Sequence, residues 1–470
     1  MNRDTSFNLK PIDPGSIALW IFSLSILSVG TRNFEQGITL DGPFYATIAR
    51  NIAKSGDWFT LNPSIPDLNP FYGNPHLGFW VFALWLKVFP AADWALRAVN
   101  HIYYVLFLNC LFFYVRRRSG TLCATMTITL LWSWFLFSNT HSNIYLDPGA
   151  LFWGSLALFL IDNRPSILLA GLAGLALGLC ALYKSMTFVG FLPAIVLVSI
   201  LNKNVPRLGA MLAVFLATLG IYWAAVKTSA EPEFLTRYWS MQITHRFAKI
   251  WSLSLLFAPE YWKQLLYYSY YLAPLSLLAL KVNFRQALLP STLAGSFIMI
   301  FSLSGLRGGQ YLVMVLPWIA WMVSQGLVPW VRFSHGAIIR STSIASLGLV
   351  CVLQYIPYRT HAKGPTPEQI EIGLLNKEQI VSHLYLDLPA TPAPFVLAAP
   401  FAWYGNVSVT YPNKGTVPEP AAQWGFFLHY RDLAREAALY QKGWCRYRGR
   451  FEEGSLWLAC DSTVFKAPGS

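Results

Sequence analysis

Two aspartates stand at the heads of expected helices and are the first candidates for chemistry. Asp41 precedes Gly42-Pro43 and an expected helix over 44–54, and Asp147 precedes Pro148 at the start of an apolar segment. Aspartate is a common N-cap and proline fits a first turn, so both positions have a structural explanation. A carboxylate at a membrane–water boundary can also act as a general base towards a sugar hydroxyl. For Asp41 the local sequence favours the cap.

Three cations are the next candidates. Lys184 and Arg307 lie in short joints at the outer ends of apolar segments, where positive-inside statistics do not favour basic residues, and Arg246 lies in a long loop. A leaving phosphate gains negative charge as its bond to a sugar breaks, so nearby cations lower that barrier. The alternative for each is snorkelling to lipid head groups. His76, beside Pro75, is either a hydrogen-bond donor or a turn residue.

The composition places these residues in a membrane protein. Of 470 residues, 55% are hydrophobic and 12% are charged, whereas soluble domains carry about a quarter charged residues. Apolar runs of roughly 15 to 20 residues recur between short polar joints, which is typical of transmembrane helices. We expect spans near 15–31, 97–115, 120–138, 148–162, 166–183, 186–201, 208–226, 263–280, 287–303, 309–329 and 337–356.

The net charge of +13 follows the same pattern, because the basic residues gather in alternate joints. This surplus indicates membrane topology, and no nucleic-acid-binding motif accompanies it. Counting 77–90 as a span would place those joints outside, so we expect a short helix there. Eleven spans result, with a twelfth still open, an inner N-terminus, an outer C-terminus and an uncleaved first anchor. The basic joints are Arg116–Arg118, Arg164, Lys203 with Arg207, Lys281 with Arg285, and Arg332 with Arg340.

The chain divides into four regions. Residues 1–31 are the N-terminal tail and first span, and 32–96 form a first outer loop with amphipathic juxtamembrane helices. Residues 97–356 are the rest of the bundle, interrupted by an outer loop at 227–262. Residues 357–470 are more polar and rich in proline, which indicates a small extracytoplasmic α/β domain.

Within that last region two cysteines flank an expected terminal hairpin. If the compartment is oxidising, Cys445 and Cys460 form a disulfide, and two unpaired core cysteines are the alternative. Cys110, Cys123, Cys180 and Cys351 are expected as apolar fillers in spans. The expected elements are a helix near 367–384, strands near 394–399 and 424–429, a helix near 431–442, and strands near 445–451 and 456–460.

Several motifs occur in an order that resembles the GT-C glycosyltransferases, in particular the lipid A aminoarabinose transferases and bacterial members of the protein O-mannosyltransferase superfamily. The resemblance covers roughly residues 30–330, and its strength lies in the colinearity of motifs that are individually weak. The motifs are Asp41-Gly-Pro-Phe-Tyr45-Ala-Thr-Ile-Ala49-Arg50, Ser55-Gly56-Asp57-Trp58, Asn74-Pro75-His76-Leu77 with Trp80, Ala95-Leu96-Arg97, Tyr145 with Asp147, Gly174-Leu-Ala-Leu-Gly178 before Lys184, Arg246-Phe247, and Phe301-Ser-Leu-Ser304 with Arg307, Tyr311 and Pro317.

This resemblance implies an all-α polytopic bundle of about 11–13 transmembrane helices and an inverting transfer of a sugar from a polyprenyl-phosphate donor to an envelope lipid, glycan or protein. Asp41 takes the position of the catalytic carboxylate and Asp147 assists it. The protein is then expected in the inner (plasma) membrane, in contact with membrane lipids, with its active site outside the cytoplasm. The residues expected around the lipid phosphate are Lys184, Arg246, Arg307, Tyr45, His76 and Tyr311.

The sequence departs from the family pattern at several positions. Gly73, Asn74 and Phe44 replace charged residues, and Met241-Gln242 replaces a His-Glu pair, so no metal site is expected. His76 or His245 could compensate, and unchanged activity in their alanine variants would remove that hypothesis. Two other functions stay open, a polyprenyl-phosphate-sugar transporter or flippase and a degenerate relative that binds the carrier lipid without catalysis.

Overall fold

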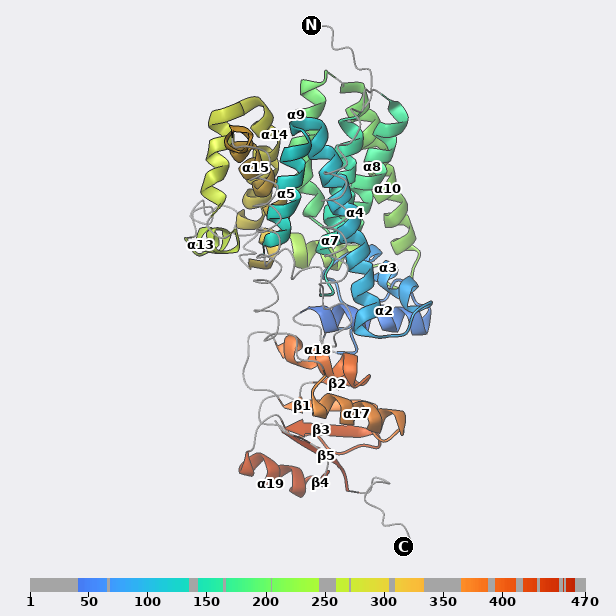
Figure 1. Cartoon of the computed structure of the whole chain (residues 1–470). Coiled ribbons are helices and arrows are strands. Elements are labelled where there is room, and N and C mark those ends of the chain that lie inside the picture. Colours follow the sequence, from blue (N-terminus) through green and yellow to red (C-terminus); the bar gives the residue numbers. More distant parts are fainter. Residues whose placement is uncertain are drawn as a thin grey trace.

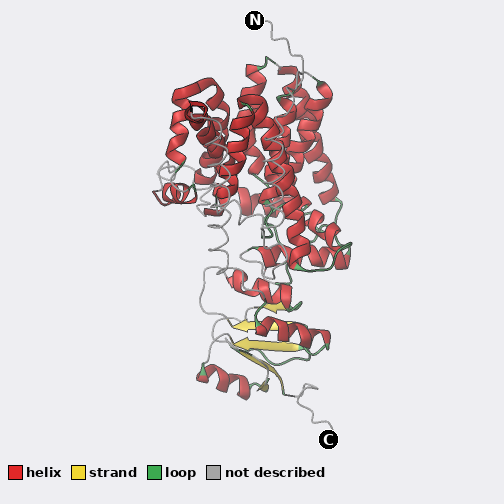
Figure 2. Ribbon diagram, in the orientation of Figure 1, coloured by secondary structure: helices red, strands yellow, loops and turns green. Residues whose placement is uncertain are grey.

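The computed structural model has a bundle of helices and a smaller domain built around a sheet, stacked end to end (Figures 1 and 2). The two parts meet at helices α2 and α18, so the bundle has one end that faces the sheet domain and one opposite end. The structure describes residues 41–65, 68–134, 143–163, 166–203, 205–244, 259–269, 272–303, 309–333, 365–387, 394–410, 417–428, 432–447, 451 and 454–460.

The helices of the bundle follow the apolar runs of the sequence. Within the described residues, three segments are long and apolar enough to cross a membrane, namely α4, α10 and Phe284–Ser302 of α14. The others are shorter but apolar. The helices are α4 (Asp93–Ser119), α5 (Thr121–Ser133), α7 (Asp147–Ile161), α8 (Ile167–Tyr183), α9 (Thr187–Leu201), α10 (Val205–Lys227), α14 (Ser276–Leu303) and α15 (Leu316–Phe333).

The expected span at 263–280 is wrong. That segment is divided into α13 (Pro259–Tyr268), the 3-10 turn η4 (Ala273–Leu275) and the start of α14, which continues through Lys281 and Arg285 as one helix. Pro274 lies in the 3-10 turn, where it fits the irregular backbone better than a helix interior. The expected spans 15–31 and 337–356 lie outside the described residues. The remaining short elements are α11 (Phe234–Tyr238), the π-helix η2 (Trp239–Thr244) and the 3-10 helix η5 (Gly309–Met314).

Small residues allow the helices of the bundle to approach closely. Gly174 of α8 lies directly against the backbone of α10, where an added Cβ would be 2.2 Å from the Met211 carbonyl oxygen. Such contact between backbones is how helices associate within a membrane, where burial of apolar surface between helices gives little driving force. Replacement of Gly174 by any larger residue would push α8 away from α10 and displace Lys184, which ends α8.

The first outer loop holds two short helices, α2 (Gly42–Ser55) and α3 (Leu77–Leu86). Helix α3 has 10 residues, about 15 Å at 1.5 Å per residue, which is half of a bilayer core. The expectation of a short helix at 77–90 is therefore confirmed. The expectation of an amphipathic juxtamembrane helix at 44–54 stays a prediction. In the structure the polar residues Thr47 and Arg50 of α2 are buried, and the helix contacts α18 of the sheet domain.

The C-terminal part is an α/β domain, as expected. Its five-stranded sheet has the order β2-β1-β3-β5-β4, in which β2, β1 and β3 are parallel and β3, β5 and β4 are antiparallel. Its elements are α17 (Pro367–Lys377), β1 (His383–Asp387), α18 (Pro394–Tyr404), β2 (Ser408–Thr410), β3 (Trp424–Leu428), α19 (Leu433–Gln441), β4 (Trp444–Arg446) and β5 (Ser455–Ala459).

Two expectations for this domain are wrong. The segment near 394–399 is the helix α18 rather than a strand, because a continuous apolar run has no periodicity that separates the two. The helix expected over 367–384 stops at Lys377, and strand β1 follows it. Strand β2 was not expected. The remaining expected strands and the helix near 431–442 are confirmed within a few residues.

Cys445 and Cys460 form a disulfide that joins the edge strand β4 to the end of β5. The bridge closes a loop with a sequence separation of 15, for which the loss of loop entropy in the unfolded chain contributes about 3 kcal/mol. We therefore expect the double variant Cys445→Ser/Cys460→Ser to lower the unfolding temperature of the sheet domain by several degrees, measured by intrinsic tryptophan fluorescence. An unchanged transition would show that the bridge adds no stability.

Candidate active site

The centre of the candidate site is an ion pair between the ends of two bundle helices. Asp147 begins α7, and Lys184 follows the last residue of α8. The Lys184 Nζ lies 2.6 Å from both carboxylate oxygens of Asp147, and the two side chains are 18% and 7% exposed. Tyr311 adds an aromatic face 5.4 Å from the same ammonium group. The pair is thus largely shielded from water, which strengthens the attraction between the ammonium group and the carboxylate.

The cap interpretation is wrong for Asp147, and Asp41 occupies the N-cap position of α2 only through its main chain. The Asp41 side chain makes no capping hydrogen bond to α2, and Asp147 lies within the first turn of α7 with its carboxylate on Lys184. Burial raises the pKa of Asp41, the positive charge of Lys184 lowers it and the negative charge of Asp147 raises it again. Asp41 therefore lies within electrostatic reach of the ion pair, although it begins a different helix.

Two tyrosines lie close enough to Asp41 for its charge to raise their pKa values. The Tyr45 hydroxyl accepts a hydrogen bond from the Asn74 Nδ2 at 3.3 Å. Burial and then the negative charge of Asp41 raise the pKa values of Tyr45 and Tyr145, so both phenols stay protonated and can act as donors. Tyr145 and Asn74 were not expected as site residues. The signal for both is their place in motifs that resemble the family, Tyr145 with Asp147 and Asn74 before Pro75-His76, although Asn74 also departs from the family pattern.

His76 does not share this environment. Its ring is fully buried, with Nδ1 2.6 Å from the Tyr222 hydroxyl and Nε2 2.8 Å from the Phe59 carbonyl oxygen. Both ring nitrogens are therefore engaged within the protein, and His76 joins the first outer loop to α10. This geometry favours a structural role for His76 in place of the expected contact with a lipid phosphate.

The buried His76 predicts a pH dependence of stability. Burial lowers the pKa of His76 from 6.5 to about 4, a difference of about 3 kcal/mol. Because the unfolded chain takes up this proton first, the stabilisation is complete above pH 6.5 and is lost as the pH falls towards 4. We expect the unfolding temperature to drop between pH 7 and pH 5, and to drop less in His76→Gln. Equal drops in both proteins would contradict this.

The other expected cations cannot be placed. Arg246, Arg307 and His245 lie outside the described residues. Of the eight residues expected in the site, the structure brings five together, namely Asp41, Tyr45, Asp147, Lys184 and Tyr311. Within the part of the chain that the structure describes, no three His, Cys, Asp or Glu side chains are grouped as metal ligands would be.

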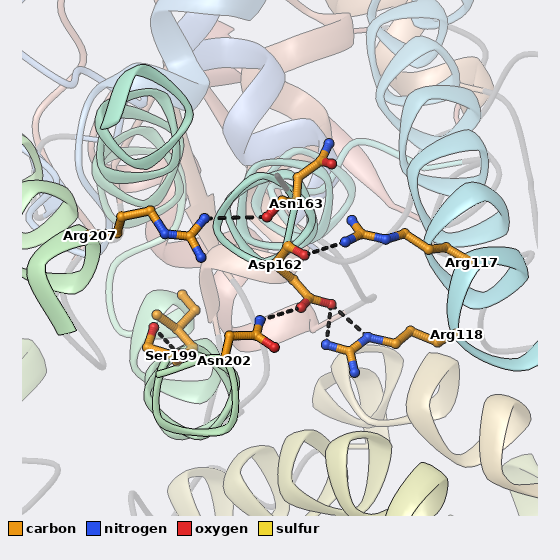
Figure 3. A network of polar contacts seen from close by, with 8 residues as sticks. Arg117, Arg118, Asp162, Asn163, Ser199, Asn202 and Arg207 are labelled. Carbon is orange, nitrogen blue, oxygen red and sulfur yellow. Dashed lines mark hydrogen bonds and ion pairs between the residues drawn. The ribbon is translucent and has the colours of Figure 1, made fainter. Parts of the chain in front are cut away.

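The opposite end of the bundle carries a second polar network, shown in Figure 3. Arg118 pairs with the Asp162 carboxylate through Nε at 2.6 Å, and Asn202 donates to the same carboxylate at 3.0 Å. Arg117 and Arg207 donate to main-chain carbonyl oxygens at the end of α7. Basic side chains at a helix C-terminus are stabilised by the helix dipole. These residues come from the expected inner joints, and α7 thus joins the two polar sites, Asp147 at one end and Asp162 just beyond the other.

Comparison with known proteins defines the class to which this fold belongs. No family model matches the chain. The crystal structure of ArnT from Cupriavidus metallidurans bound to undecaprenyl phosphate superposes with a TM-score of 0.68 and 14% sequence identity over 94% of this chain and 97% of that protein. The apo structure of the same protein gives a TM-score of 0.64 at 14% identity, over 94% and 98% of the two chains. The chain is thus a polytopic membrane protein with the GT-C fold.

Within that class, the chain resembles the aminoarabinose transferases. It is 26% identical over 343 residues to an undecaprenyl phosphate-alpha-4-amino-4-deoxy-L-arabinose arabinosyl transferase of Shewanella sediminis (strain HAW-EB3). The alignment covers 69% of this chain and 60% of that curated relative. The resemblance inferred from the sequence motifs is therefore confirmed, together with the bundle and the added sheet domain.

Proposed function

We propose that the chain is an integral-membrane glycosyltransferase that moves a sugar from a polyprenyl-phosphate donor to an acceptor in the cell envelope. The observation that carries this proposal is the grouping of the Asp147–Lys184 pair with Asp41, at the head of the helix α2 that contacts the sheet domain. The curated relative and the lipid-bound structural neighbour are both named for undecaprenyl phosphate, which supports the same class of donor here.

In this proposal Asp41 is the general base. Its carboxylate takes the proton of an acceptor hydroxyl as that oxygen attacks the anomeric carbon of the sugar, and the bond from that carbon to the phosphate oxygen breaks on the opposite side. A single displacement of this kind inverts the anomeric configuration. The raised pKa of Asp41 brings its basicity closer to what proton abstraction near neutral pH requires.

Lys184 is the group that stabilises the leaving phosphate. The polyprenyl phosphate gains negative charge as it departs, and a fixed ammonium group in a largely water-free site stabilises that charge without reorganisation. Asp147 holds the ammonium through both carboxylate oxygens, so Asp147 orients the lysine. Tyr45 and Tyr145 supply hydroxyl donors towards the same region.

The proposal is tested with the full chain purified and reconstituted into vesicles. The vesicles carry an undecaprenyl-phosphate-linked sugar and a lipid extract of the cell envelope, and mass spectrometry follows the products. A glycosylated acceptor together with free undecaprenyl phosphate supports a transferase. Movement of the carrier lipid across the bilayer without a product would support a flippase, and lipid binding without either would support a non-catalytic relative.

A further inference from the structure

The last turn of α18, in the sheet domain, is held by two charged side chains from the rest of the protein. Arg50 of α2 donates hydrogen bonds to the carbonyl oxygens of Ala402 and Trp403 at 2.9 and 2.8 Å, and its guanidinium lies 5.3 Å from the Trp403 ring centre. Asp93, at the start of α4, accepts from the Trp403 indole at 2.8 Å and from the Tyr404 hydroxyl at 2.9 Å. The turn is thus bound to both α2 and α4.

The buried Arg50 guanidinium donates its hydrogen bonds to α18. Its side chain is 5% exposed, and within the described residues no carboxylate forms an ion pair with it. Burial lowers its pKa to about 10, so it stays charged at neutral pH. The carbonyl oxygens at the C-terminal end of α18 carry partial negative charge and replace the water that the guanidinium has lost. Without α18, the guanidinium would lose both carbonyl partners and the Trp403 ring beside it.

Helix α2 also carries Asp41 at its head. Arg50 and Asp41 are nine positions apart on one continuous helix, whose residues 42–50 are all buried. If α18 leaves, α2 loses the two hydrogen bonds that fix Arg50, and a short helix that then shifts does so as a unit. Such a movement displaces Asp41 from Lys184 and from the polar groups around it.

We propose that Arg50 and Asp93 are positioning residues, through which the docked sheet domain holds α2 so that Asp41 faces the Asp147–Lys184 pair. This inference rests on the proposed function, because it connects the sheet domain to the proposed catalytic base. The sheet domain is then part of the catalytic apparatus, and its attachment sets the rate of transfer.

The first test compares kinetics of full-length variants. Arg50→Ala removes the contact, and Arg50→Lys keeps the charge but lacks the planar guanidinium that reaches both carbonyl oxygens. Trp403→Phe removes the indole donor to Asp93 and leaves a smaller ring beside Arg50. We expect kcat to fall about 100-fold in Arg50→Ala and less in the two milder variants, since small misplacements of reacting groups have effects of this order. KM for the undecaprenyl-phosphate-linked sugar should stay unchanged, because Lys184 is untouched.

The matched control is Lys54→Ala. Lys54 also joins α2 to the sheet domain, through a hydrogen bond of 3.1 Å to the Asn406 side chain, but this bond is exposed. Its loss removes an exposed hydrogen bond and no buried contact, so we expect kcat to match that of the unmodified protein. A fall in Lys54→Ala equal to that in Arg50→Ala would overturn the special role of the buried contact.

A second test does not depend on activity. In an Asp41→Cys protein, the rate of labelling of that thiol by a membrane-impermeant maleimide reports how far the head of α2 is exposed. We expect the added Arg50→Ala or Trp403→Phe change to raise this rate several-fold and Lys54→Ala to leave it unchanged. Unchanged labelling and unchanged kcat in the Arg50 and Trp403 variants would overturn the inference. If labelling rises but Asp41→Asn is fully active, Arg50 and Trp403 do position α2, and the proposed catalytic role of Asp41 is wrong.

Discussion

Replacement of Asp41 by asparagine should reduce sugar transfer by about 100- to 10,000-fold, the range that a positioned general base contributes. Asparagine has almost the same shape as aspartate and cannot take up the proton of an acceptor hydroxyl. The variant should still bind undecaprenyl phosphate, because Lys184 keeps both of its bonds to Asp147. The measurement is kcat from initial rates of product formation, together with the Kd of the carrier lipid.

The matched control is Asp57→Asn in the same outer loop. The Asp57 carboxylate accepts from the main-chain N–H groups of Phe59 and Thr60, and an asparagine oxygen can accept the same bonds. This variant removes one negative charge from the loop without removing the proposed base, so its kcat should be unchanged. Normal activity in Asp41→Asn would exclude Asp41 as the base, whatever the control shows.

Replacement of Lys184 by methionine should reduce kcat by about 100- to 1,000-fold, the effect of removing one donor that stabilises a developing negative charge. It should also shift the acidic limb of kcat/KM to higher pH, because Lys184 lowers the pKa of Asp41. Asp147→Asn removes a charge that raises this pKa, so it should shift the same limb to lower pH. The measurement is the pH profile of each variant.

Opposite shifts are the diagnostic result. Lys87→Met serves as the control, since Lys87 lies over the Trp58 ring at 4.9 Å in the same loop and is not among the groups that shift the pKa of Asp41. Its pH profile should match that of the unmodified protein. Shifts of equal direction in Lys184→Met and Asp147→Asn would mean that these two charges do not act on the pKa of Asp41 in opposite directions.

The sequence was most informative where one property repeats along the chain. Long apolar runs predict α4 and α7 to α10 within a few residues, and Asp-Pro at 147–148 marks the start of α7 correctly. Prediction was poorer where the local sequence is compatible with both a helix and a strand. The run that forms α18 is apolar on all sides because it packs between the sheet and α2, and it therefore has neither a helical nor a strand period.

The partners of the site residues could not be predicted from local sequence. Asp41 has the sequence context of a cap, and only the fold shows that its charge lies near those of Lys184 and Asp147. Arg50 and its carbonyl partners are separated by 352 and 353 positions. His76 has the sequence context of a turn, and its burial against Tyr222 becomes visible only when α10 packs beside the outer loop. The expectation that Asp41, Asp147 and Lys184 belong to one site came from the order of the family-like motifs along the chain.

The most direct test of the central claim is a cryo-electron microscopy structure of the full chain in a lipid nanodisc with undecaprenyl phosphate. We predict phosphate density about 3 Å from the Lys184 Nζ, on the side of the Asp147–Lys184 pair that faces Asp41. Phosphate density at the opposite end of the bundle, beside Arg117 and Arg118, would contradict the account. Phosphate density beside Lys184 with the Asp41 carboxylate turned away from that phosphate would also contradict the account.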